Sequence, residues 1–343
     1  MNVLGDGNNY AMYKCMKIAI IGNGIAAWCV NKYLLNKDSS LNILRFGNDE
    51  FIRTCSLRTT SINCMRGTQK GISPLGDLMV DSMEEFLSYY QDYPLRAVEK
   101  TYEMQCWQAE DSKFSKRFKD YTQISSIEEI ELSKKMFAYK SDAYLIHPLK
   151  LYHEFNLKDV SGNLVKEVIQ LDSGFKIIAD SGEFQVDKVI LCAAGFNELF
   201  KDLITNEDAL DFIQRTKPVK GDYLYLKAEH GIKAKSIAIE NHHLIFRENE
   251  ILIGSTSFND NAIHAINHSE LRAVYEHIVD SIRFQLPSYD SFDAICGIRS
   301  KGRKRTPYWN QVADDVYMVG GLYKNAFSFA FKAAADLTDL ILK

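Results

Sequence analysis

Three small residues near the start of the chain have the types and spacing of a phosphate-binding turn. Gly22, Gly24 and Ala27 form the pattern G-x-G-x-x-A. The first glycine of this pattern permits a tight turn, the second lets the backbone approach a pyrophosphate, and the small third residue lets a helix pack closely on a strand. An apolar run precedes the turn at 17–22, and a helical pattern follows it at 26–37. This context predicts dinucleotide binding, with the phosphates at the positive helix N-terminus; a purely structural turn is the alternative.

The end of the second predicted strand leaves the identity of the nucleotide open. The strand covers 41–46, and Arg45 stands where an acidic residue would hold the ribose hydroxyls. An arginine can instead accept a 2′-phosphate, which makes NADP a competitor. Asp49 or Glu50, a few residues later, could reach the ribose. The turn alone therefore does not decide among these cofactors.

A segment rich in Ser, Thr and Gly covers 53–77 and contains three arginines, Arg53, Arg58 and Arg66. Segments of this length without periodicity are usually functional or disordered. Its hydroxyls, amides and cations suit an anionic ligand, so we expect an ordered cofactor loop in which Thr60 and Ser61 are candidate contacts.

Helices and strands are expected in a definite order along the rest of the chain. Helical patterns cover 83–93, 114–119, 269–285 and the C-terminal segment after Gly321. Segment 144–155 is interpreted as a strand end, a turn at His147-Pro148 and a helix; neither His147 nor His153 is expected to be a base. Strands 164–172, 174–182 and 184–195 form a predicted meander that ends in an apolar strand. A second antiparallel set covers 218–227, 234–240, 242–249 and 250–257.

Composition excludes several classes of protein. The 343 residues include 41 Lys and Arg against 45 Asp and Glu, a net charge of −4 that supplies no overall field for nucleic acid or an anionic membrane. The seven cysteines are scattered and form no C-x-x-C pair, so we expect reduced thiols and no metal site. No apolar run is long enough for a membrane span. We expect a cytoplasmic protein of about two domains, with residues 1–16 a loose leader.

The order of motifs from Lys17 onward resembles the D-amino-acid oxidase–like FAD-dependent oxidoreductases, the group of glycine and sarcosine oxidases. The matching blocks are, in order, IIGNGIAAW, YLIHPLKL, KVILCAAG, PVKGDYLYL, ILIGSTS, CGIRS and GGLYKNAFSFAF. The resemblance implies FAD, not NADP, because the later blocks belong to a flavin fold without a nicotinamide domain.

The fold implied is α/β, with a Rossmann-like FAD-binding domain interleaved with an antiparallel-sheet α+β substrate domain. The expected FAD-binding domain is discontinuous and comprises 17–78, 144–215 and 295–343. The substrate domain comprises 79–143 and 216–294.

The resemblance also implies roles for particular residues. Arg299 matches the arginine that pairs with a substrate carboxylate, and a guanidinium fork suits a planar carboxylate. Lys324 and Asn325 match an Arg-Asn pair beside the flavin, and Lys324 would support the negative charge of the reduced flavin. The expected catalytic residues are Arg299, Lys324 and Tyr323, the last as part of the pocket wall. The expected cofactor-binding residues are Gly22, Gly24, Ala27, Arg45, Thr60, Ser61, Val168, Ala194, Gly195, Gly321, Lys324, Asn325, Ala326 and Phe327.

The expected reaction is oxidation of the C–N bond of an amine or amino acid that bears a carboxylate. Several residues depart from the family pattern: Arg45, Gly302-Arg303-Lys304 where T-x-D is usual, and Ala326 in place of a glycine. Cys296 misses by one residue the position at which some sarcosine oxidases attach FAD, so covalent attachment is not expected. Tyr223, Tyr225 and Tyr308 are further candidates for the pocket wall.

Alternatives remain at this stage. Arg299 could form a structural ion pair, and the protein could be a flavin-binding partner or dehydrogenase subunit without oxidase activity. The basic run Lys301–Arg305 is either a solvated face or a contact for a larger anionic substrate such as a peptide, a nucleotide or modified tRNA.

Overall fold

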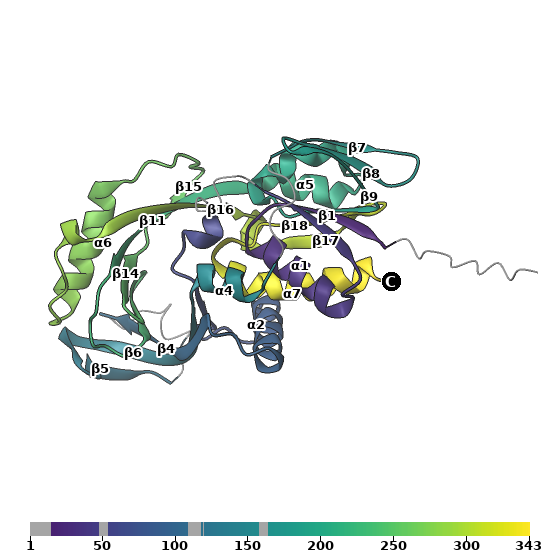
Figure 1. The fold of residues 1–343 in the computed structure, drawn as a ribbon. Coiled ribbons are helices and arrows are strands. Elements are labelled where there is room, and N and C mark those ends of the chain that lie inside the picture. Colours follow the sequence, from purple (N-terminus) through teal and green to yellow (C-terminus); the bar gives the residue numbers. More distant parts are fainter. Residues whose placement is uncertain (1–14, 48–53, 109–117, 119, 158–163) are drawn as a thin grey trace, which may run out of the picture.

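The computed structural model describes residues 15–47, 54–108, 118, 120–157 and 164–343 (Figure 1). Most of the expected leader, together with Asp49, Glu50 and Arg53, lies outside the described residues, as does most of the helix expected at 114–119.

A five-stranded sheet positions the phosphate-binding turn. Its strand order is β17 (Tyr308–Ala313), β18 (Val316–Gly320), β10 (Lys188–Leu191), β1 (Lys17–Ile21) and β2 (Asn42–Phe46). All neighbouring strands are parallel except β17, which is antiparallel to β18. Strands buried on both faces need continuous apolar runs, which explains why β1 and β10 have no alternating pattern.

Different elements cover the two faces of this sheet. Helices α1 (Ile25–Lys37), α2 (Pro74–Asp92) and α7 (Ala326–Ile341) share one apolar core with Ile18 and Ile20 of β1 (Figure 1). A three-stranded antiparallel sheet of β7 (Val165–Gln170), β8 (Phe175–Ala179) and β9 (Gly182–Val186) packs with Ala19 and Ile21 on the other face, together with α5 (Glu207–Arg215). The side-chain alternation of β1 thus joins two separate cores.

A second, ten-stranded sheet forms the other half of the molecule. Its path runs β15 (Phe258–Asn259), β11 (Lys217–Lys227), β14 (Glu250–Gly254), β13 (His242–Arg247), β12 (Lys235–Ile239), β4 (Val98–Trp107), β6 (Ile130–Ile146) and β3 (Ile62–Cys64). Two further strands, β16 (Asp293–Lys301) and β5 (Thr122–Ile127), pair with β11 and β6. Helix α6 (His268–Ser281) packs on this sheet at the end of the molecule far from β1 (Figure 1).

Most predicted elements are confirmed, with three corrections. The helix expected from 83 begins at Pro74, because Ser73 Oγ accepts a hydrogen bond from Gly76 N (3.1 Å) and proline suits the first helical turn. The helix expected over 269–285 covers His268–Ser281. The meander ends at β9, and its expected last strand, β10, instead enters the parallel sheet beside β1.

The predicted fold class is confirmed, since parallel and antiparallel sheets alternate along the chain. Strand β16 contacts both halves: it pairs with β11 along its whole length, and Lys301 bridges to Leu322 beyond β18. The domain boundaries themselves stay a prediction. Of the described helices, none is long and apolar enough to cross a membrane.

Candidate active site

The carboxyl ends of three neighbouring parallel strands meet at one edge of the five-stranded sheet. Gly22 follows β1, Cys192 follows β10, and Gly321 follows β18. In open α/β sheets this edge is where ligands bind. The sheet therefore brings together three of the blocks that lie far apart in the sequence.

Gly22 occupies a backbone position that only glycine can adopt comfortably. Its φ is +133°, and a Cβ atom there would lie 2.3 Å from the carbonyl oxygen of Cys192. Its N–H donates to the carbonyl oxygen of Phe46 at 2.7 Å. The turn is thus fixed between the ends of β10 and β2, as the G-x-G-x-x-A pattern predicts.

The N-terminus of α1 has the donor chemistry of an anion site. Its N-cap, Gly24, has no side chain to cap the helix, and its first turn contains no acidic residue. Ser56 Oγ accepts from Ile25 N at 2.9 Å, while the following amides lack intrahelical acceptors. Backbone N–H groups and the positive end of the helix dipole suit the phosphates of a dinucleotide, so these residues fit an FAD pyrophosphate.

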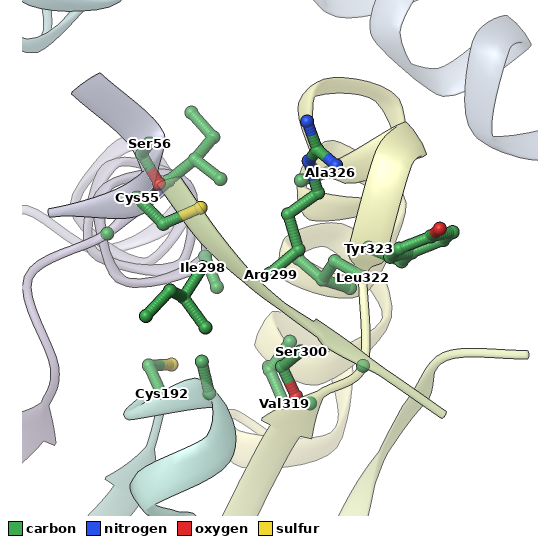
Figure 2. Close-up of a pocket in the computed structure, with 16 residues that line it drawn as sticks. Cys55, Ser56, Cys192, Ile298, Arg299, Ser300, Val319, Leu322, Tyr323 and Ala326 are labelled. Atoms are coloured by element: carbon green, nitrogen blue, oxygen red, sulfur yellow. Dashed lines mark hydrogen bonds between the residues drawn. The ribbon is translucent and has the colours of Figure 1, made fainter. Parts of the chain in front are cut away.

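A cavity opens beside this helix N-terminus, and Figure 2 shows the side chains around it. We call it the central cavity. It is lined by Gly24, Ile25, Ala26, Cys55, Ser56, Cys192, Ala194, Ile298, Arg299, Ser300, Val319, Gly320, Gly321, Leu322, Tyr323 and Ala326. Six predicted site residues are among them: Gly24, Ala194, Arg299, Gly321, Tyr323 and Ala326.

Other predicted site residues lie next to the central cavity without lining it. Gly22 and Ala27 shape the turn and the helix behind it, and Ala27 is fully buried. Asn325 is the N-cap of α7, and the carbonyl of buried Phe327 accepts a hydrogen bond from Asn63 Nδ2 (3.0 Å). Gly195 follows Ala194 in the turn after β10.

Four predicted cofactor contacts lie in other surroundings. Thr60 and Ser61 precede β3, where the carbonyl of Ser61 accepts from Ile146 N (2.9 Å). Val168 is in β7, paired with Ile177 in the three-stranded sheet. Arg45 is 1% exposed, and its Nη2 donates to the hydroxyl of Tyr152 at 2.8 Å.

Arg299 extends its side chain from β16 into the central cavity, toward Ala326 (Figure 2). Its guanidinium packs on Gly221 of β11, where a Cβ atom would lie 2.5 Å from Nη2. Its Nη1 is buried and has no hydrogen-bond partner among the residues that the structure describes. A buried guanidinium N–H without an acceptor is costly, so a bound anion is the natural partner for this group.

Tyr323 brings two ammonium groups to the same region. It has a left-handed backbone, with φ of +53°, at the start of a short 3₁₀ turn, Tyr323–Asn325. The Nζ atoms of Lys301 and Lys324 lie 5.9 Å and 5.8 Å from the centre of its ring. Desolvation, together with the like charges of Arg299 and Arg305, lowers the pKa of Lys324 to about 8.

We expect the acylation rate of Lys324 by an amine-reactive reagent to rise with a midpoint near pH 8, as the neutral amine forms. In the urea-denatured protein the same lysine should titrate near its ordinary pKa of about 10.4. Peptide mass spectrometry at a series of pH values measures both profiles. Identical profiles in the folded and denatured protein would contradict the placement of Lys324 among cations.

A buried carboxylate lies on the side of the site formed by the ten-stranded sheet. Glu103 of β4 is fully buried and accepts from Arg66 Nε (2.7 Å) and Nη2 (2.9 Å) and from Ser236 Oγ (3.1 Å). His243 Nδ1 lies 3.2 Å from its Oε1. Burial alone would raise the pKa of Glu103, but Arg66 and His243 outweigh it and hold the pKa well below the ordinary range.

Replacing Glu103 by glutamine is therefore expected to destabilise the fold by about 2–4 kcal/mol at pH 7, because Arg66 loses its counter-ion. The carboxyl pKa is depressed in the folded state, so this stabilisation is present above the unfolded pKa and is lost as pH falls through the folded pKa. The free energies of unfolding of E103Q and of the wild type, measured in urea, should show the whole difference at pH 7 and a smaller difference below pH ~4.5. The matched control E167Q, on an exposed strand position, should change stability by less than about 0.5 kcal/mol.

Sequence reasoning missed several residues of the site. Cys55 and Ser56 belong to the segment that was expected to be a cofactor loop, but neither was singled out. Burial raises the pKa of Cys55 and raises that of Cys192 to about 12, so both remain thiols. Gly221 lies in the PVKGDYLYL block, and only its packing on Arg299 reveals its role.

Cys296 and His147 lie away from the central cavity. Cys296 pairs with Asp222 across β16 and β11, and burial, followed by Asp222, raises its pKa to about 11. His147 is the N-cap of the short helix Pro148–Glu154, in the predicted turn. Of the tyrosines considered for the pocket wall, Tyr323 lines the central cavity, whereas Tyr308 stacks on Phe212 with ring centres 5.2 Å apart. Among the residues described, no group of His, Cys, Asp and Glu side chains could hold a metal ion.

Comparison with solved structures shows which fold this site belongs to. The chain superposes on glycine oxidase from Geobacillus kaustophilus with a TM-score of 0.74 and 12% identity, covering 95% of each chain. Dithionite-reduced L-α-glycerophosphate oxidase from Mycoplasma pneumoniae, with FAD bound, gives 0.77 and 13%, covering 96% of this chain and 95% of that one. L-proline dehydrogenase from P. horikoshii gives 0.73 and 15%, covering 95% and 93%. No protein-family model matches the sequence, and no curated protein matches it significantly.

The fold is therefore that of the D-amino-acid oxidase–like FAD-dependent oxidoreductases, as the order of motifs predicted. The likeness extends over nearly the whole chain at very low sequence identity.

Proposed function

We propose that the protein binds FAD and oxidises the C–N bond of an amine that carries a carboxylate. The observation that carries the proposal is the buried Nη1 of Arg299, which has no hydrogen-bond partner within the described part of the chain. It lies in the same cavity that begins at the phosphate-binding turn. A cationic fork for a carboxylate therefore lies beside a site for a dinucleotide. The solved structures of this fold include a glycine oxidase and a proline dehydrogenase, names that describe amino-acid substrates.

Each part of the site has a role in this proposal. The turn at Gly22 and Gly24 and the N-terminus of α1 hold the pyrophosphate. Bound FAD supplies the acceptor for a hydride, which is a proton together with two electrons. This hydride leaves the substrate carbon as the C–N bond becomes C=N. Arg299 binds the carboxylate and so fixes which C–H bond faces the cofactor. Water then hydrolyses the imine product.

Two further residues, Lys324 and Ala326, contribute charge and shape to the proposed site. Lys324 bears a positive charge near the cavity, where it opposes the negative charge that accumulates on electron transfer. No side chain has to remove a proton if the amine binds in its neutral form. Ala326 places a methyl group in the cavity lining where the related pattern has glycine, which narrows the space beside α7.

The absorption spectrum of the purified protein tests the cofactor, and anaerobic mixing with amines tests the reaction. We expect a yellow protein with flavin bands, flavin released on denaturation, and bleaching by at least one amino or imino acid. A yellow protein that no amine bleaches would instead support a flavin-binding subunit without oxidase activity. A colourless protein that takes up no FAD would contradict both.

A further inference from the structure

Four cations near the end of β16 and the turn after β18 have no anionic partner among the described residues, and one of them, Arg299, lines the central cavity. Arg299, Lys301, Lys324 and Arg305 form no ion pair with any of the described residues, and we call them the cation cluster. Arg299, Arg305, Arg66 and Lys301 all lie close enough to Lys324 to lower its pKa, after the larger effect of desolvation. The cluster is therefore a concentrated positive field at the cavity.

The geometry directs at least three of these groups to one place. Lys301 is two residues beyond Arg299 on β16, so both side chains emerge on the same face of the strand. A β-bridge joins Lys301 to Leu322, which brings the turn of Tyr323 and Lys324 against the end of that strand. Tyr323 is a lining residue of the cavity, and the Nζ atoms of Lys301 and Lys324 lie 5.9 Å and 5.8 Å from the centre of its ring.

The carboxylates of this region are already engaged. Glu103 is bound by Arg66, and Asp260 pairs with Lys217 at 2.9 Å. The polar contact of Lys301 is neutral, from Nζ to Asn259 Oδ1 at 2.6 Å. An asparagine orients the ammonium group without neutralising it.

A single carboxylate does not balance this charge. The carboxylate of the proposed substrate balances Arg299, which leaves Lys301, Lys324 and Arg305 without a counter-charge among the described residues. Holding like charges together is unfavourable unless a ligand supplies counter-charge. The ligand should therefore bring more than one negative charge.

We propose, on the basis of the proposed function, that the substrate is a small dianion: an amine with one carboxylate for Arg299 and a second anionic group for Lys301 and Lys324. The second group is a carboxylate or a phosphate, because both accept hydrogen bonds from ammonium groups. A small molecule fits better than a polymer, since these two lysines flank the ring of Tyr323, a residue that lines the cavity. The other basic residues of the run, Arg303 and Lys304, line a separate hollow with Phe212 and Tyr308.

Matched substrate pairs test this inference with the purified flavoprotein. Flavin bleaching is followed for aspartate against asparagine and for glutamate against glutamine, in both enantiomers. O-phosphoserine against serine separates a phosphate from a carboxylate. In at least one pair, we expect kcat/KM to be about tenfold or more higher for the dianionic member than for the other member. One added charge-assisted hydrogen bond gives a difference of this size.

Calorimetry gives a second readout that does not depend on turnover. Malonate and succinate should bind about tenfold more tightly than acetate and propionate. K301Q should reduce the ratio of dicarboxylate affinity to monocarboxylate affinity about tenfold. The control K304Q, whose side chain lines the separate hollow with Phe212 and Tyr308, should leave this ratio unchanged. Equal affinities for mono- and dicarboxylates, or equal kcat/KM within every pair, would overturn the inference.

Two further outcomes separate this inference from the proposed function. If no amine bleaches the flavin but dicarboxylates bind more tightly in a Lys301-dependent way, the dianion site is supported and the proposed reaction is wrong. If bleaching occurs only with monoanionic amines, the reaction is supported and the dianion site is wrong. Salt-sensitive binding of tRNA or heparin, without a preference for dicarboxylates, would also overturn the small-dianion proposal.

Discussion

Replacing Arg299 by methionine is expected to lower kcat/KM for a carboxylate-bearing amine by about 10²–10⁴-fold, while the protein remains folded and yellow. The variant keeps the apolar stem but removes the fork that would bind the carboxylate. Loss of one partner of a buried, hydrogen-bonded charge pair typically costs about 3–5 kcal/mol, which corresponds to this range. Because the buried Nη1 has no hydrogen-bond partner among the described residues, the free energy of unfolding should not fall.

Stopped-flow measurement of flavin bleaching, together with thermal unfolding, checks this expectation. R299K keeps the charge without the bidentate geometry and should fall between the wild type and R299M. The matched control is R303M, an exposed arginine of the same basic run, which should retain wild-type kcat/KM. If R299M bleached as fast as the wild type, Arg299 would not be the carboxylate ligand.

Substitution of Gly221 tests the position of the Arg299 side chain independently. Replacing it by alanine places a methyl group 2.5 Å from Arg299 Nη2, so the guanidinium has to move. We expect G221A to raise KM for the carboxylate substrate with a smaller effect on the flavin spectrum, because Gly221 acts by positioning Arg299. An unchanged KM would mean that Arg299 reaches its ligand from a different rotamer.

Replacing Gly22 by alanine is expected to abolish FAD binding and to destabilise the fold by about 3–5 kcal/mol. Two effects add: the positive φ of +133° is strained for any L side chain, and the new Cβ atom overlaps the Cys192 carbonyl at 2.3 Å. Backbone strain of this kind costs about 1–3 kcal/mol and overpacking about 1–3 kcal/mol. The carbonyl cannot withdraw freely, because β10 is hydrogen-bonded on both sides.

The structure offers a closely matched control for this prediction. Gly182 has the same φ of +133°, but no atom lies within 4 Å of its Cβ position. G182A should therefore lose only the strain, about 1–3 kcal/mol, and should keep its FAD. Urea unfolding and the flavin absorbance of both purified variants give the comparison; equal losses in the two would show that the contact with Cys192 is unimportant.

Much of the fold was predictable because its signals are local. The apolar run at 17–22, the small residues of the turn and the helical pattern after it occur together within a short segment, and each follows from backbone sterics. Helix starts were less well predicted: α2 begins at Pro74, nine residues before the helix expected from Met83. Leu75, Leu78 and Met79 extend its apolar face into the segment that was expected to be a loop, and the Ser73 cap fixes the start.

The candidate site was predictable only in part. Arg299, Tyr323 and Gly321 come to one cavity with Gly24, as the order of blocks indicated. Arg45, Val168 and Ser61 lie outside the cavity lining, because a position in a motif does not fix which face of a strand its side chain occupies. The partners that set the electrostatics, Glu103 with Arg66 and Gly221 with Arg299, come from strands far apart in the sequence.

By itself, the sequence determined the phosphate-binding turn, the α/β class and the order of elements, because the periodicity and steric preferences behind them act over a few residues. Only the tertiary structure decided that Arg299 packs on Gly221 with no acceptor, in the described parts of the chain, for its buried Nη1, and that Lys301 and Lys324 flank the same tyrosine ring. Burial and unbalanced charge are properties of side chains that meet from different strands, so no spacing along the chain could reveal them.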